Sequence, residues 1–369
     1  MRRTHWLLPA AAALALAVAG CGGSGDDDDD GGGEANAAAA TSTSASAPAA
    51  AARCENVKAT YQLSFFPNAQ YVGTLVAFDK GYMADEGLDV ELKPGGPTVN
   101  PALQLAQGNV DFAEMPLSDA YNAAANGGGL VLIGQGAQQN PLRFISFKRE
   151  NPLSGPEDLA GKSVGAQQAG NLAPELKGIL DSAGLGPDDI TIKQISFNTD
   201  DFVARRVDVF PARVYAHFSM LEAKGYRYPD DFDTLDPNEY GAGIADEGTY
   251  VNRDFHDEHP EAAACVLRAL KRGWATALGD RQAAIAAVRR YAPRGAFTDR
   301  DIEVGVGEML RLGTTTPDGE RTEPLHVDAD YIEQSIERLR DAGVVKGEVD
   351  VDRFMDLAPQ QAVEGAGGG

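Results

Sequence analysis

Amide, hydroxyl, aromatic and basic side chains gather in five short segments of this chain, at 65–71, 114–119, 138–140, 167–171 and 211–217. Amides and hydroxyls donate and accept hydrogen bonds, and aromatic faces stack on planar molecules. Such groups are suited to holding a small solute. The candidate ligand contacts are Phe66, Asn68, Tyr71, Ser118, Gln138, Asn140, Gln168, Asn171, Arg213, Tyr215 and His217.

Some of these residues have an equally good structural interpretation. Ser118 or Asp119 can cap the helix expected to follow them, and one of the rings of Phe65 and Phe66 is expected in the core. The neutral amides at 138–140 suit an uncharged heterocycle better than a strong anion. The backbone N–H groups near 167–171, at a predicted helix start, can bind an acceptor or an anion.

A catalytic interpretation has weaker support. Ser163 lies in Gly161-Lys162-Ser163-Val164-Gly165, which fits the G-x-S-x-G pattern of hydrolases. That motif needs a strand before the serine and a helix after it, whereas here a polar turn precedes Ser163, which itself begins a strand. His256 and His259 stand among acidic residues at a helix start, where such residues are expected without a metal. No catalytic residue, metal or cofactor is expected, and a secreted hydrolase is the alternative of a different class.

The candidate residues are connected by alternating strand and helix patterns. Short apolar runs alternate with amphipathic stretches that end at glycine, which favours parallel sheets covered by helices. The expected strands are 57–65, 88–92, 110–113, 130–134, 143–147, 163–166 and 190–195, with helices at 73–80, 101–107 and 173–183.

The C-terminal third is predicted to be helical. Pro260 stands at a favourable first position of a long helix, in which apolar residues recur at helical spacing. Further helices are expected at 299–312 and 329–342. The sequence therefore predicts an α/β body followed by a helical C-terminal wrap.

The first residues carry an export signal. Arg2 and Arg3 precede an apolar stretch at 6–19 that is too short for a membrane span of about 20 residues. The run Leu16-Ala17-Val18-Ala19-Gly20-Cys21 resembles a bacterial lipobox, which implies removal of a signal peptide at 1–20 and lipidation of Cys21. The alternative is an ordinary signal peptide with an incidental cysteine.

The next segment, 21–54, is predicted to be a disordered tether. It contains five consecutive aspartates, then three consecutive glycines and a run rich in Ala, Ser and Thr, so it cannot bury enough apolar surface to fold. Its role would be to give a lipid-anchored domain reach near the membrane.

Charge and cysteine content limit the possible partners. The formal charge of −23 disfavours binding to nucleic acid. Once Cys21 is lipidated, Cys54 and Cys265 are the remaining thiols, and two cysteines in an exported domain often pair. A buried, free Cys265 is the alternative.

Several motifs together resemble a known family. The segments 65–73 and 80–90, the turn Pro94-Gly95-Gly96, then 107–112, 156–165, 206–209 and 259–261, and finally Gly273-Trp274, follow one another in the order found in solute-binding proteins of ABC importers. The branch is the one that binds alkanesulfonates, nitrate and thiamine pyrimidine precursors. The resemblance covers roughly residues 57–355.

The resemblance implies a two-lobed, periplasmic-binding-protein-like (type II) α/β fold. One lobe would comprise 55–145 with 249–369, and the other 146–248. It further implies an extracytoplasmic, membrane-anchored monomer that captures a small planar heterocycle, such as a thiamine pyrimidine precursor or a riboflavin-like compound, for an ABC importer. An alkanesulfonate, taurine or another small anion is the alternative solute.

One segment departs from the thiamine-precursor branch. Tyr215 matches the expected tyrosine, but Ala216 and His217 stand where asparagine and glutamate are expected. The missing carboxylate would be an acceptor for a pyrimidine amino group, whereas Arg213 and His217 supply donors. This segment is therefore compatible with both the heterocycle and the small anion.

Overall fold

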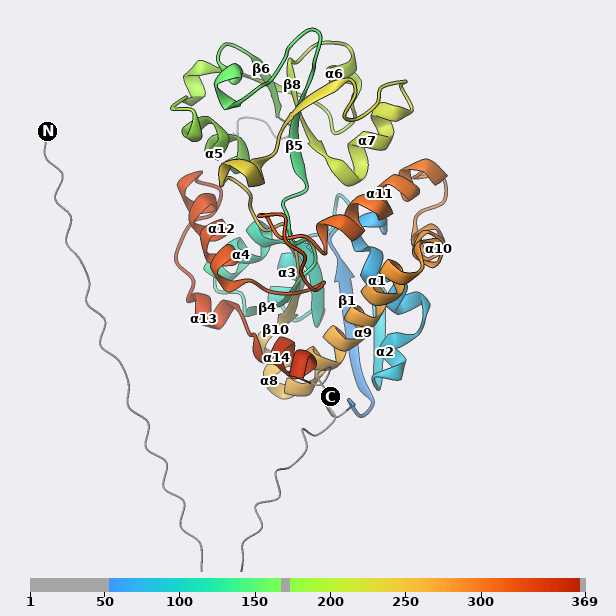
Figure 1. Cartoon of the computed structure of the whole chain (residues 1–369). Helices are drawn as coiled ribbons and strands as arrows, with labels where there is room; N and C mark the ends of the chain where they lie inside the picture. The colour runs from blue at the N-terminus through green and yellow to red at the C-terminus, as the bar shows by residue number, and fades with distance from the viewer. Residues whose placement is uncertain (1–52, 167–172, 366–369) are drawn as a thin grey trace, which may run out of the picture. The chain divides into compact units, whose positions relative to one another are not determined.

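The computed structural model describes residues 53–166 and 173–365, all of which belong to one compact unit. This part contains two five-stranded sheets, and Figure 1 shows them in separate lobes. Some expectations concern residues outside the described part, namely the signal peptide at 1–20, Cys21, the tether up to residue 52, Gln168 and Asn171.

The first sheet has the strand order β2-β1-β3-β10-β4. β1 is parallel to β2 and β3, whereas β10 is antiparallel to both of its neighbours. The position of β10 inside the sheet, between β3 and β4, is notable because this strand comes after the whole second sheet in the sequence. The strands are β1 (Val57–Leu63), β2 (Leu88–Lys93), β3 (Phe112–Pro116), β4 (Leu130–Gln135) and β10 (Glu247–Asn252).

Helices cover both faces of the first sheet, and β4 has buried apolar residues on both of its sides. In β4, Val131 and Ile133 belong to the core shared with α1 and α9, whereas Leu130 and Leu132 pack with α3, α4 and α12. This alternation follows from the period of two in a strand. The helices of this lobe are α1 (Val72–Asp79), α2 (Tyr82–Asp85), α3 (Pro101–Ala106), α4 (Leu117–Ala125), α8 (Arg253–Glu258), α9 (Pro260–Gly279), α10 (Arg281–Tyr291), α11 (Asp299–Leu312), α12 (Ala329–Asp341), α13 (Val351–Phe354) and α14 (Ala358–Gly365), with the 3-10 helix η1 (Ala69–Tyr71).

The second sheet has the order β7-β6-β8-β5-β9. Phe144 of β5 packs with α5 on one face, and its neighbour Ile145 packs on the other face. The elements are β5 (Leu142–Phe147), β6 (Ser163–Ala166), β7 (Thr191–Gln194), β8 (Val209–Arg213), β9 (Phe232–Leu235), α5 (Pro174–Ser182), α6 (Asp200–Val203), α7 (Val214–Glu222), and the 3-10 helices η2 (Pro156–Leu159), η3 (Pro187–Asp189) and η4 (Pro237–Tyr240).

The chain crosses between the sheets twice, through 136–141 and 236–246. The two crossings are hydrogen-bonded to each other, because the Asn140 side chain donates to the Ile244 carbonyl oxygen at 2.8 Å. They also bracket the second sheet, since β5 begins at Leu142 and β10 at Glu247. These limits fall a few residues before the predicted lobe boundaries at 145 and 248.

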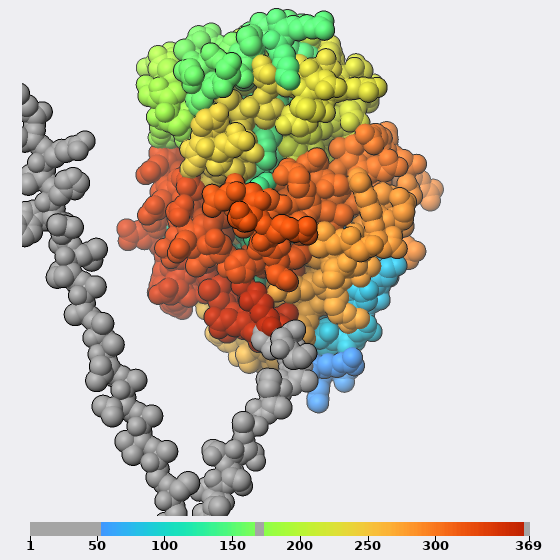
Figure 2. Space-filling model, in the orientation of Figure 1, coloured from blue at the N-terminus to red at the C-terminus, as the bar shows by residue number. Residues whose placement is uncertain are grey.

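C-terminal helices contact the second lobe on both sides of the crossings. α11 packs on α7, and α12 packs on α5; Figure 2 shows the orange and red C-terminal segments lying against the green and yellow second lobe. On the α11 side, Arg300 donates to Glu222 at 2.8 Å. Of the helices in the described part of the chain, none is both long and apolar enough to cross a bilayer.

Two glycines bring α1 and α9 into unusually close contact. A Cβ atom on Gly273 would lie 2.2 Å from the backbone oxygen of Gly73, and one on Gly73 would lie 2.3 Å from the Trp274 ring. Backbone cannot move aside as a flexible side chain can. The Gly273-Trp274 pair of the family motif is therefore explained by helix packing.

Gly273→Ala is accordingly expected to lower the free energy of unfolding by about 1–3 kcal/mol, the usual cost of overpacking a core. Gly279→Ala is the matched control, because Gly279 is in the same helix and a Cβ atom there would meet no atom within 4 Å. That control is expected to stay within about 1 kcal/mol of wild type. Urea denaturation of the two variants checks the prediction, which equal stabilities would contradict.

A disulfide joins the start of the described chain to α9. Cys54 and Cys265 are bonded across a sequence separation of 211, with their Cα atoms 6.3 Å apart. Both cysteines are buried. The bond fixes the residues before β1 against the helix that packs on the first sheet.

Candidate functional site

A cleft of about 680 Å³ lies between the two sheets, within the range typical of small-molecule sites. Its walls are the ends of β3, β6 and β8, the first turns of α4 and α5, the end of α12 and both crossings. The polar or charged residues that line it are Ser118, Asp119, Asn122, Asn140, Glu175, Arg213 and Asp246.

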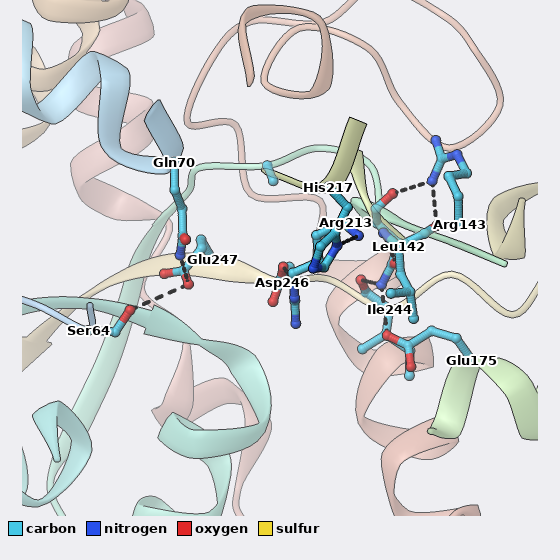
Figure 3. Close-up of polar contacts among 12 residues, drawn as sticks. Ser64, Gln70, Leu142, Arg143, Glu175, Arg213, His217, Ile244, Asp246 and Glu247 are labelled. Carbon is cyan, nitrogen blue, oxygen red and sulfur yellow. Dashed lines mark hydrogen bonds and ion pairs between the residues drawn. The ribbon is translucent and has the colours of Figure 1, made fainter. Parts of the chain in front are cut away.

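An ion pair between the lobes lies at the centre of this region. Arg213 Nη1, at the end of β8, lies 2.6 Å from Asp246 Oδ2, just before β10; Figure 3 shows the two side chains meeting. Asp246 belongs structurally to the first lobe, because its carbonyl oxygen accepts the Leu117 N–H at 2.9 Å. Asp246 raises the pKa of Arg213, so the guanidinium stays charged and engaged.

Carboxyl groups outnumber cations in the cleft. Asp119, Glu175 and Asp246 line it, whereas Arg213 is its one cation among the described lining residues. Partial burial, with the neighbouring Asp246 carboxylate, raises the pKa of Asp119. Burial likewise raises the pKa of Glu175, against the hydrogen bond that Asn140 donates to it. The cleft is therefore rich in hydrogen-bond acceptors.

Two further carboxyl groups, which do not line the cleft, are buried in the first lobe near Asp246. Glu247 accepts hydrogen bonds from Gln70 and, at 3.5 Å, from Ser64, as Figure 3 shows. Glu114 accepts them from Thr74 at 2.8 Å and from Tyr61 at 3.1 Å. Burial, together with the nearby Asp246 and Glu114, holds the pKa of Glu247 well above its usual range.

Burial also raises the pKa of Glu114 from 4.5 to about 7. Because the folded state binds this proton more tightly than the unfolded state, the contribution of Glu114 to the free energy of unfolding falls as pH rises from 4.5 to about 7. Glu114→Gln removes this dependence. The difference in free energy of unfolding, variant minus wild type, is expected to be about 3 kcal/mol larger at pH 8 than at pH 5.

Urea denaturation at pH 5 and pH 8 measures this difference. Glu91→Gln is the control, because Glu91 is an exposed glutamate of β2, and it should show the same pH dependence as wild type. If the free energy of unfolding of Glu114→Gln changed with pH as that of wild type does, the raised pKa of Glu114 would be contradicted.

The predicted amide cluster lies in the first crossing. Gln138 is buried and donates to the carbonyl oxygens of Gln135 and His326, at 2.7 and 2.9 Å. Gln139 donates to the Thr316 carbonyl oxygen at 2.6 Å. These two amides brace the crossing, whereas Asn140 both braces it and lines the cleft.

The aromatic segment after β1 has mixed roles. Asn68 caps η1, accepting from the Gln70 N–H and donating to the Phe66 carbonyl oxygen. Tyr71 is buried, and its hydroxyl bonds Ser64 Oγ at 2.7 Å. Phe65 and Phe66 keep 42% and 38% of their surface exposed. The expectation that one of these rings lies in the core is therefore wrong, and both rings are available for contact with a solute.

His217 and Tyr215 lie on α7, next to Arg213. His217 is fully buried, and both of its ring nitrogens are hydrogen-bonded to the backbone, at Arg213 and Phe197. Tyr215 is half-buried where α7 meets α11, and its carbonyl oxygen closely approaches Gly305. Of the three candidate contacts in this segment, Arg213 is the one that lines the cleft.

The structure thus brings Ser118, Asn140 and Arg213 together in one cleft and places Glu175 and Asp246 beside them. The last two did not stand out in the sequence, because neither belongs to a polar segment after a predicted strand. A useful signal for Glu175 was its position in the first turn of a helix predicted near the site.

Ser163, the serine of the hydrolase-like pattern, does not have the position in its strand that a catalytic serine needs. Ser163 is the first residue of β6, and its hydroxyl donates to Asp208 at 2.7 Å. A nucleophile elbow would place the serine after the strand, at the end where the cleft lies. His256 bonds Asp356 at 2.8 Å, and no three metal-ligating side chains gather anywhere in the described residues.

Two curated relatives are binding proteins. The chain is 27% identical to a formylaminopyrimidine-binding protein of Halalkalibacterium halodurans over 216 residues, which is 58% of this chain and 64% of the relative. It thus spans a little under two thirds of that relative's length. It is 25% identical to the riboflavin-binding protein RibY of Chloroflexus aurantiacus over 311 residues, covering 80% of this chain and 84% of the relative.

Solved structures confirm the predicted fold. The aliphatic sulphonate binding protein SsuA of Escherichia coli superposes with a TM-score of 0.63 at 16% identity, covering 82% of this chain and 92% of that one. A Candida albicans protein described as having the generic periplasmic binding protein fold gives 0.53 at 14%, covering 82% and 96%. The desulfurization enzyme DszB gives 0.56 at 14%, covering 84% and 99%. The fold therefore serves both binding and catalysis.

The family predicted from the order of the motifs is also confirmed. A family model described as NMT1/THI5 like matches residues 68–284, which is more than half of the chain and includes every polar residue that lines the cleft. This chain belongs to the NMT1/THI5-like family.

Proposed function

We propose that this chain is an extracytoplasmic solute-binding lipoprotein that captures a small planar nitrogen heterocycle for an ABC importer. A thiamine pyrimidine precursor or a riboflavin-like compound fits the proposal. The names of the two binding relatives support this class of solute. The lobes would close on the solute by bending at the two crossings, and the solute would be released unchanged.

The observation that carries the proposal is the excess of carboxyl groups in the cleft. Asp119, Glu175 and Asp246 offer acceptors, and the amino and ring N–H groups of a heterocycle are donors that match them. Arg213 is already bound to Asp246, so it is poorly available to an anion. The proposed contacts are Ser118, Asp119, Asn140, Glu175, Arg213 and Asp246.

Arg213 also supports a second candidate, a small anion such as an alkanesulfonate or taurine. It is the one cation among the described residues that line the cleft. A guanidinium binds a sulfonate through charged hydrogen bonds. Such a ligand would have to displace Asp246 from Arg213, which makes the anion the weaker candidate.

The membrane attachment is proposed from the sequence. Lipidation at Cys21 and the tether at 21–54 would hold a monomeric binding domain close to its importer. Metabolic labelling with a radioactive fatty acid tests this part of the proposal. Label in wild type that is lost in Cys21→Ala is the expected result, and unlabelled wild-type protein would contradict it.

Calorimetry of the purified protein with a ligand panel tests the solute class. The expected result is 1:1 binding of formylaminopyrimidine or riboflavin, without turnover, and little binding of methanesulfonate. Native mass spectrometry of protein purified from its host would identify a solute that the panel omits. Tight binding of methanesulfonate alone would favour the anion. Hydrolysis of an ester panel, abolished by Ser163→Ala, would overturn the binding function.

A further inference from the structure

One exposed aromatic ring of the second lobe follows the carboxyl end of β7, next to the end of β6 that lines the cleft. Phe197 follows β7 and keeps 48% of its surface exposed. β7 is parallel to β6, and the Ile195 N–H donates to the carbonyl oxygen of Ala166, the last residue of β6, at 2.9 Å. Ala166 lines the cleft. Phe197 comes two residues after Ile195, which is hydrogen-bonded to this cleft residue.

The loop that carries Phe197 is held in place by His217. The Arg213 backbone N–H donates to His217 Nδ1 at 2.7 Å, so Nε2 carries the proton and donates to the Phe197 carbonyl oxygen, also at 2.7 Å. The two rings lie 4.5 Å apart between centroids. Burial lowers the pKa of His217 to about 4, so this arrangement persists at neutral pH. His217 thereby links the loop of Phe197 to the backbone of Arg213, which lines the cleft.

The exposure of Phe197 is not explained by the core. An aromatic ring contributes to stability through the apolar area that it buries, and this ring leaves nearly half of its surface in water on an anchored loop. In the first lobe, Phe65 and Phe66 are also exposed, by 42% and 38%, and they too follow a parallel strand, β1. Exposed rings therefore follow the carboxyl ends of parallel strands in both lobes.

We propose that Phe197 stacks on the planar ring of the captured solute and is the aromatic wall that the second lobe presents to the cleft. This inference rests on the proposed function and adds to it the residue that selects for planarity. The carboxyl groups of the cleft would bind the donors at the edge of the solute, and Phe197 would bind its face.

Calorimetry of the full-length protein with formylaminopyrimidine and with riboflavin tests the inference. Phe197→Ala is expected to weaken binding of the planar solute by about 10- to 100-fold, the range seen for aromatic stacking on nucleobases. Phe197→Tyr, which keeps the ring, should bind as wild type does, and Phe197→Leu should fall between the two. Leu278→Ala is the control, because Leu278 is similarly exposed but lies on α9, and it should bind as wild type does.

Circular dichroism of each variant checks that it is folded, which the exposure of Phe197 leads us to expect. If wild type binds a planar probe and Phe197→Ala binds it equally well, the inference on Phe197 is overturned and the proposed function stands. If wild type binds methanesulfonate and neither planar probe, the proposed function is overturned together with the inference.

Discussion

Replacing both Cys54 and Cys265 with serine is expected to lower the free energy of unfolding by about 2–5 kcal/mol, the usual cost of losing a native disulfide. The bond closes a loop with a sequence separation of 211, and a long closed loop restricts the unfolded chain strongly. Both sulfur atoms are buried, so the variant also loses packing at α9. Urea denaturation of wild type and the double variant without reductant measures the effect.

Reductant provides the control for this experiment. Reduced wild type also lacks the cross-link, so it should unfold at a lower urea concentration than oxidised wild type and at or slightly above that of the double variant, because it keeps the buried sulfur atoms. Thiol titration of denatured, unreduced protein that carries Cys21→Ala should detect no free thiol. Two free thiols per chain would show that Cys54 and Cys265 do not pair.

Asp246→Asn is expected to reverse the selectivity of the cleft. The substitution frees Arg213 from its ion pair and removes one carboxylate acceptor. Affinity for methanesulfonate should rise by about 10- to 100-fold, the range expected for a new hydrogen bond to a charged group. Affinity for an amino-substituted heterocycle should fall at the same time. Calorimetry with both ligands measures the two changes in one variant.

Asp119→Asn is the matched control for Asp246→Asn. It removes one negative charge from the same cleft but leaves the ion pair between Arg213 and Asp246 intact. Its methanesulfonate affinity should therefore stay close to that of wild type. Equal gains in the two variants would mean that net charge governs selectivity, and no gain in either would mean that Arg213 does not bind the solute.

The alternation of strands and helices could be predicted where apolar residues follow a clear period. The structure has α11 (Asp299–Leu312) at its predicted limits, and α9 starts at Pro260 as expected. β3 is different, because it runs from Phe112 to Pro116 and was expected at 110–113. The start of β3 is determined by Asp111, whose side chain accepts hydrogen bonds from the backbone N–H and the hydroxyl of Thr60. Only the folded sheet creates this contact.

β10 could not be predicted from its composition. Glu247–Asn252 reads Glu-Gly-Thr-Tyr-Val-Asn, with no apolar run and no clean alternation, yet all six residues are buried. Its backbone pairs with β3 and β4 on either side. Tertiary pairing therefore outweighs the weak local preference of this segment.

The site was predicted only in part, because a residue that bonds a ligand and one that bonds its own chain look alike in a sequence. Asn68 and Gln138 have the amide expected of a ligand contact, but the structure uses those amides for a cap and for the first crossing. Asp246 shows the opposite problem. It reaches the cleft because the second crossing returns the chain to the first lobe, and no local pattern in the sequence predicts that return.

The place of β10 within the first sheet also bears on how this protein is made. The chain is synthesised from its amino end, and β4 lacks its neighbour until Asn252 has followed. The second sheet, from Leu142 to Leu235, is continuous in sequence and needs no later segment for its strands. The inserted lobe can therefore fold during synthesis while the lobe around it is still incomplete, and the unpaired edges of β3 and β4 would need protection from aggregation until β10 follows.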